Sequence, residues 1–171
     1  SMSKGATLIC ESVGGCQVSG NSVLGMNGTC SGTSTKLYRI SGFEFTGTST
    51  RIWYNAYNTP PCTLNNIRID NNTFLGTDDD QRILQFGDNS NNAYFYGVID
   101  NNTVTNADGV VFAEFFASDG ATAPAGTNAT ADNMYFEDNT FNITSSPGLT
   151  QCVDSTGSPG IVWRYNTSTN C

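Results

Sequence analysis

The sequence predicts an all-β solenoid, a parallel β-helix of about six rungs, on two observations. First, one strand-turn-strand phrase recurs along the 171 residues: LNNIRIDNNTFLG at 64–76, YGVIDNNTVTN at 96–106 and MYFEDNTFNIT at 134–144. A phrase that returns at such intervals is typical of stacked structural repeats. Second, Leu, Lys and Glu are sparse while Asn, Thr, Ser, Gly and aromatic residues abound. This composition favours short strands and turns over long helices.

The rungs are placed along the chain by aligning the phrase. Residues 1–16 are expected to be an N-terminal cap or a tag remnant, and residues 17–171 the rungs of a single domain. The inward anchors of successive rungs are predicted at Val18, Ile40, Ile69, Ile99, Phe136 and Trp163. Apolar runs at 52–54, 83–86, 110–116 and 149–153 would supply further strands, separated by turns rich in Gly, Asn and Pro.

Inward positions of the phrase include an asparagine as well as apolar residues. If Ile69 and Asn72 both point inward, strict alternation breaks between them, so a turn is expected at Asn71. The same register predicts a structural ladder of stacked amides that hydrogen-bond one another, interrupted by Phe43 in the second rung. The ladder residues are Asn21, Asn72, Asn102, Asn139 and Asn166.

The outward side of the same strands gathers the candidate binding residues, which are Arg39, Arg68, Asp70, Asp100, Tyr135 and Glu137. Adjacent rungs lie ~4.8 Å apart. Asp70 and Asp100 would therefore approach the ~5 Å spacing of retaining glycosidase carboxylates, and Asp70 and Glu137 the ~9 Å spacing of inverting ones. These three carboxylates and Arg68 are the catalytic candidates. The alternatives are a sugar or Ca²⁺ site without catalysis, and ordinary solvated turn residues.

The repeat resembles the right-handed parallel β-helix of the pectate-lyase-like superfamily, in RIDNNTF (68–74), VIDNNTV (98–104) and YFEDNTF (135–141). The resemblance covers about 150 residues, from Val18 to Asn166, and implies the fold. The superfamily includes polysaccharide lyases and hydrolases, tailspikes, adhesins and non-catalytic surface proteins, so fold alone selects no function.

Loop residues Asp78, Asp79 and Asp80 faintly resemble the Asp pair of polygalacturonase-like hydrolases and are candidate Ca²⁺ ligands, with an ordinary solvated turn as the alternative. The His motif and the Arg/Lys motif of that family are absent from this chain. A pectate-lyase-type reaction would use Ca²⁺ and an Arg base, for which Arg68 or Arg39 could serve. No cofactor is required by the sequence, and Ca²⁺ is the one candidate.

The six cysteines indicate disulfide bonds and therefore an extracellular, cell-surface or virion-surface location. They are Cys10, Cys16, Cys30, Cys62, Cys152 and Cys171, and their spacing fits no common zinc site. Local pairs such as Cys10–Cys16 and Cys152–Cys171 are plausible, and many connectivities stay open. Six buried thiols are the alternative.

Charge narrows the functional classes. The net charge is −8 with 7 basic residues and no His, which disfavours nucleic acid binding and excludes His-dependent nucleophilic catalysis. No stretch approaches the ~20 apolar residues of a membrane span.

The sequence thus predicts a glycan-binding surface module, or a tailspike-like or adhesin-like one, whose partner is a polysaccharide or surface glycan. One alternative is a polysaccharide-degrading enzyme, either a glycoside hydrolase or a Ca²⁺-dependent lyase. The other is a structural protein that self-associates end to end, because open solenoid ends expose unpaired strand edges.

Overall fold

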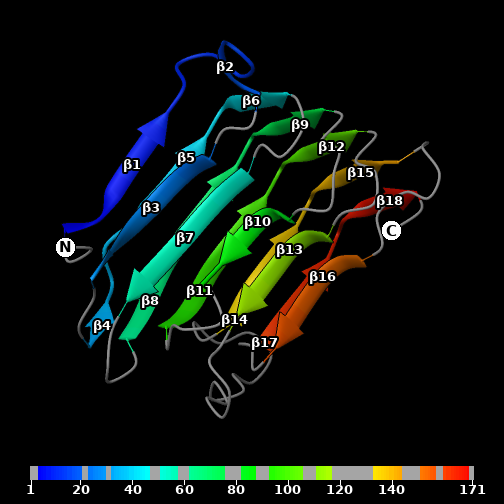
Figure 1. Ribbon diagram of the computed structural model, residues 1–171. Helices are drawn as coiled ribbons and strands as arrows, with labels where there is room; N and C mark the ends of the chain where they lie inside the picture. Colours follow the sequence, from blue (N-terminus) through cyan, green and yellow to red (C-terminus); the bar gives the residue numbers. More distant parts are fainter. Residues whose placement is uncertain are drawn as a thin grey trace.

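The computed structural model describes residues 4–20, 23–29, 32–46, 51–57, 62–75, 82–87, 93–105, 111–116, 133–143, 151–156 and 160–169. Within these residues the secondary structure is almost entirely β-strand, arranged as three parallel sheets (Figure 1). The predicted fold class, an all-β parallel solenoid, is confirmed. No helix among the described residues has the length and apolar character needed to cross a membrane.

We name the three sheets A, B and C in the order in which the chain visits them. Each rung contributes to the sheets in this order, so neighbouring strands of one sheet come from successive rungs. Sheet A orders β1 (Ala6–Ile9), β5 (Tyr38–Ser41), β8 (Cys62–Asp70), β11 (Ala93–Asp100), β14 (Asn133–Glu137) and β17 (Gly160–Arg164), and the short β4 (Thr33–Ser34) also pairs with β8. Sheet B orders β2 (Cys16–Ser19), β6 (Phe43–Thr46), β9 (Thr73–Leu75), β12 (Thr103–Thr105), β15 (Thr140–Asn142) and β18 (Thr167–Thr169). Sheet C orders β3 (Val23–Thr29), β7 (Arg51–Tyr57), β10 (Arg82–Phe86), β13 (Val111–Phe116) and β16 (Gln151–Thr156).

The core consists of columns of like side chains that run along the solenoid. In sheet A the register stacks Leu8, Ile40, Ile69, Ile99, Phe136 and Trp163. In sheet C the ring of Phe86 lies 4.5 Å from that of Phe115 and 5.6 Å from that of Tyr54, both in stacked geometry. Such aromatic stacking adds to the stabilisation from burying apolar area.

The prediction that Val18 is the first anchor of the Ile40 column is wrong. β1 pairs with β5 and places Leu8 beside Ile40, whereas β2 pairs with β6 and places Val18 beside Phe45 in sheet B. β1 thus belongs to sheet A, although it lies in the segment expected to cap the stack. The first rung misled the alignment because it lacks the Asn-Thr phrase and inserts a disulfide-bridged loop, Cys10–Cys16, between its first two strands.

A sharp corner joins sheet A to sheet B in each repeat of the phrase. The corner residues Asn71, Asn101, Asp138 and Tyr165 have φ values of 53–59°, and Gly42 takes the same place in the second rung with φ 84°. This left-handed backbone is the turn expected at Asn71. Asparagine and aspartate tolerate it better than most residues, and glycine adopts it freely.

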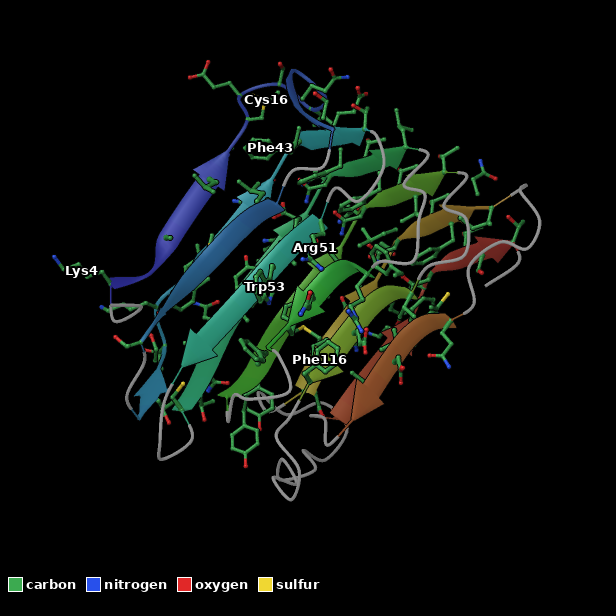
Figure 2. The ribbon with its side chains drawn as sticks, viewed as in Figure 1. Lys4, Cys16, Phe43, Arg51, Trp53 and Phe116 are labelled. Carbon is green, nitrogen blue, oxygen red and sulfur yellow. A yellow bond between two sulfur atoms is a disulfide. The ribbon has the colours of Figure 1, made fainter. Side chains whose placement is uncertain are left out.

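The asparagine ladder forms along the inner side of this corner. The side chains of Asn72, Asn102, Asn139 and Asn166 hydrogen-bond in succession, each Nδ2 donating to the Oδ1 of the next at 2.9–3.1 Å. At the N-terminal end the ladder closes on Phe43, whose backbone N–H donates to the Oδ1 of Asn72 at 3.0 Å. Asn21 lies outside the described residues, and the register instead sets Cys16 beside Phe43 (Figure 2).

Candidate functional site

The three predicted carboxylates stand beside one another at the ends of neighbouring sheet A strands. Asp70 is in register with Asp100, Asp100 with Glu137, and Glu137 with Arg164. Because these positions directly precede the left-handed corner, each side chain lies on the outer edge where sheet A ends. The structure therefore brings the acidic column together as the alternating pattern predicts.

Arginines from the preceding rung neutralise two of these carboxylates. Arg39 donates to Asp70 through Nε at 2.7 Å and Nη2 at 2.6 Å. Arg68 repeats the arrangement one rung later, donating to Asp100 through Nε at 3.1 Å and Nη2 at 2.9 Å. Such two-point pairs are the strong form of the arginine–carboxylate interaction. The repulsion expected between the carboxylates is thus offset by guanidinium groups.

Asp70 is closed to solvent. Its side chain is 0% exposed, and it accepts further hydrogen bonds from the Ser41 hydroxyl at 3.1 Å and from Asn71 Nδ2 at 2.7 Å. Burial acts to raise the pKa of Asp70, but the hydrogen bonds from Arg39 and Ser41 outweigh it, so the pKa lies below its usual value. Asp70 is therefore an ionised, internally bonded group, which is the opposite of a proton-donating catalytic acid. Asp100, with a side chain 9% exposed, likewise accepts hydrogen bonds from an arginine, Arg68, and from the following corner residue, Asn101, at 2.9 Å.

The arginine–carboxylate pattern changes at the C-terminal end of the predicted site. Val98 occupies the position that Arg68 holds one rung earlier, so no arginine of β11 reaches the Glu137 carboxylate. Arg164 from the following strand donates to that carboxylate at 2.8 Å. The Arg164 guanidinium lies 5.1 Å from the Tyr135 ring centroid and 5.8 Å from that of Tyr165. We call Tyr135, Glu137, Arg164 and Tyr165 the aromatic patch.

Tyr165 stands out within this patch. It occupies the left-handed corner position with φ 59°, and its residue surface is 76% exposed. A left-handed backbone costs roughly 1–2 kcal/mol per residue for ordinary side chains. The other described corners hold glycine, asparagine or aspartate, so only this one carries that cost. Strain of this kind is found more often at functional sites. Sequence reasoning missed Tyr165 because the asparagine pair is absent from the last repeat.

The outer side of sheet C carries a second polar and aromatic network that the sequence pattern did not reveal. Figure 2 places Arg51 and Trp53 on β7 and Phe116 on β13. Arg51 donates to Gln85 at 3.1 Å and lies 5.4 Å from the Trp53 ring centroid, while the Trp53 indole N–H donates to a backbone carbonyl. These bonds satisfy one another within the sheet, and Gln85 is buried. We therefore assign this network the structural role of holding the strands of sheet C together.

The remaining cysteine and metal candidates are only partly covered by the structure. Cys10 and Cys16 form a disulfide, and Cys62 and Cys152 are also disulfide-bonded. The described residues contain no group of three or more side chains arranged to hold a metal ion. Outside the described residues lie Cys30, Cys171, Asp78, Asp79 and Asp80.

Comparison of the chain with protein-family models, with curated proteins and with solved structures finds no match. The function therefore has to be argued from this chain's own geometry.

Proposed function

We propose that the protein is a glycan-binding solenoid module and that the aromatic patch at the end of sheet A is its binding surface. The observation that carries the proposal is the strained, exposed Tyr165 beside an arginine–carboxylate pair. Tyrosine faces pack against the apolar faces of sugar rings, and charged side chains hydrogen-bond sugar hydroxyls. The patch supplies both kinds of contact within one small surface.

The patch is also partly organised before any ligand arrives. Arg164 is held between two aromatic rings and paired with Glu137, so few rotamers are lost on binding. Both ions keep part of their surface in solvent, with side chains 45% and 20% exposed. By contrast, Asp70 has no surface from which to contact a sugar. Arg39 and Arg68 each bind one of the buried carboxylates at two points, so we assign Arg39, Arg68, Asp70 and Asp100 to holding sheet A, although the Arg68 side chain is 45% exposed. Tyr135 and Glu137 are assigned to the ligand.

Two finer assignments accompany the proposal. Membership of the pectate-lyase-like superfamily is supported by the three copies of the Asn-Thr phrase and by the ladder and corner that they build. An extracellular, cell-surface or virion-surface location is supported by the Cys10–Cys16 disulfide and by the bonded state of Cys62 and Cys152. Neither binding nor location calls for Ca²⁺.

The test is a panel of neutral and acidic polysaccharides scored both for retention of the protein and for release of soluble sugar. Tyr165→Asn removes the ring while supplying a residue suited to the left-handed corner. We expect this variant to fold, to melt ~2–4 °C higher through relief of about 1 kcal/mol of strain, and to bind at least ~10-fold more weakly, about 1.4 kcal/mol.

The matched control is Asn101→Gly, which also changes a corner residue but lies two rungs from Tyr165. It should bind as the parent does. The proposal fails if the parent retains no member of the panel, or if Tyr165→Asn binds with unchanged affinity. Release of sugar would favour the polysaccharide-degrading alternative in its place.

A further inference from the structure

Within the described residues, the exposed large apolar side chains lie at the two ends of the solenoid. Among the described residues, the large apolar side chains classed as exposed are Leu8, Ile9, Val13, Leu37, Trp163 and Tyr165. The first four belong to the first rung or lie against it, and the last two belong to the last rung. The core columns between them, such as Ile40 to Phe136, are fully buried. Solenoids that stay monomeric normally end in polar capping repeats.

The strand edges at these ends are open as well. In the described part of the chain, β1, β2 and β3 each pair with a strand on one side only, and the same holds for β16, β17 and β18. Figure 1 shows the two sets at opposite ends of the molecule. Each end thus presents unpaired backbone N–H and C=O groups beside exposed apolar side chains. An edge of this kind pairs readily with another strand.

We propose that the partner of each end is the opposite end of a second copy of this chain, stacked head to tail. All the strands are parallel, so continuing sheets A and B across a junction requires β17 and β18 of one copy to meet β1 and β2 of the next. The sheet A register then sets Leu8 of one copy over Trp163 of the other, which extends the buried column. In sheet B it sets Val18 over Ser168. The last described strand of sheet C is β16, one rung before β17 and β18, so the junction is argued from sheets A and B.

Charge at the ends agrees with this pairing. Lys4 lies at the outer corner of the first rung just before β1 (Figure 2), and Lys36 lies beside it, against Gly5. Stacking two N-terminal ends would bring the lysines of both copies together, whereas head-to-tail stacking keeps them apart.

The size of the ends sets the kind of association. A standard stable interface uses roughly 20–30 residues on each side. The first rung, 4–29, is of that size, but the last described strands offer fewer residues. The contact should therefore be reversible and concentration-dependent. Because a head-to-tail contact leaves a free end on every assembly, it produces open chains and not a closed dimer.

The experiment is sedimentation velocity of the full chain from 1 to 500 µM, chosen as roughly the range where reversible contacts titrate. Two variants each block one end at an exposed position: Ile9→Lys, which would face Arg164 of the next copy, and Ser168→Lys, which would face Val18. Thr103→Lys, in the middle of sheet B, is the matched control. Circular dichroism and melting temperature verify that each variant is folded.

The parent and the Thr103→Lys control should form a ladder of multiples of the monomer mass as concentration rises. Each end variant alone should remain monomeric, and an equimolar mixture of the two should form dimers and nothing larger, because one intact end of each kind is left. A parent that stays monomeric at 500 µM overturns the proposal. So does loss of assembly in only one variant, which is the signature of a two-fold contact between like ends.

Discussion

Removing one interior amide of the ladder should cost far more stability than removing the last one. Asn102 is buried, and its Oδ1 accepts from the N–H of Asn72 at 3.0 Å and from Asn72 Nδ2 at 3.1 Å. Its Nδ2 donates to the carbonyls of Ile69 and Asp100 and to Asn139 Oδ1 at 2.9–3.1 Å. Asn102→Ala deletes all of these bonds together.

The expected loss of stability depends on which groups around Asn102 lose their only hydrogen-bond partner. The Asn72 N–H is left without its acceptor in the interior, at ~1–3 kcal/mol, and the other lost bonds contribute about 0.5–1.5 kcal/mol each where a partner survives elsewhere. Asn72 Nδ2 keeps the carbonyl of Ile40, and Asn139 Oδ1 keeps the N–H of residue 102. We therefore expect the free energy of unfolding to fall by about 4 kcal/mol.

The comparison is Asn166→Ala at the open end of the ladder. Asn166 makes the same kinds of bond, to Asn139 and to the carbonyl of Phe136, but it is only partly buried, so water replaces what is lost. Its cost should be about 1 kcal/mol. Urea denaturation of both variants measures the difference in unfolding free energy, provided that the two variants have the same m-value. Equal costs for the two variants would refute the reasoning that stacked interior amides hold the corner.

Three further predictions concern the ion pair, the bulge and the first rung. Because the pKa of Asp70 is lowered in the folded state, its ionisation stabilises the fold above the unfolded pKa of about 3.9, and this contribution is lost as pH falls through the folded pKa. The stability deficit of Asp70→Asn should therefore be largest at neutral pH and shrink below pH ~4 in unfolding titrations; a constant deficit would contradict it. Gly97 sits at a bulge where a Cβ would lie 1.9 Å from a β8 carbonyl oxygen, so Gly97→Ala should cost at least ~3 kcal/mol, and a melting temperature within 2 °C of the parent, roughly 0.5–1 kcal/mol, would count against it. The Cys10→Ser, Cys16→Ser double variant removes a bridge that closes a loop with sequence separation 6, so in calorimetry it should be about 2 kcal/mol less stable than the oxidised parent; equal stability would contradict this.

Much of the candidate site depends on distances that cross rungs. The alternation of Arg68 and Asp70 predicts that both point outward on sheet A, and both do. It does not predict that Arg68 bonds chiefly to Asp100 in the next rung, at 2.9 Å, and lies 3.7 Å from its own neighbour Asp70. That choice depends on the diagonal offset between rungs. The same offset turns two of the three expected catalytic carboxylates, Asp70 and Asp100, into structural ion pairs and leaves Glu137 to pair with Arg164.

In the first rung the sequence pattern predicts the wrong sheet for Val18. Val18 precedes a Gly-Asn pair and resembles an anchor, yet the disulfide loop of Cys10 to Cys16 moves it into sheet B. Only the pairing of β2 with β6 assigns Val18 to sheet B, because a single apolar residue fits an inward position in any of the three sheets.

By itself the sequence determined the parallel solenoid, the inward columns from Ile40 to Trp163, the left-handed corner at Asn71 and the amide ladder from Asn72 to Asn166. These features repeat from rung to rung. Each residue of the phrase therefore stacks on the equivalent residue of the next copy, and the repeat itself predicts which residues are in contact. Only the tertiary structure decided which charges pair, that Asp70 is closed to solvent, and that Tyr165 and the rung ends are exposed. Those properties depend on which side chains the neighbouring rung places next to a residue. The first and last described rungs each have a neighbouring rung on one side only.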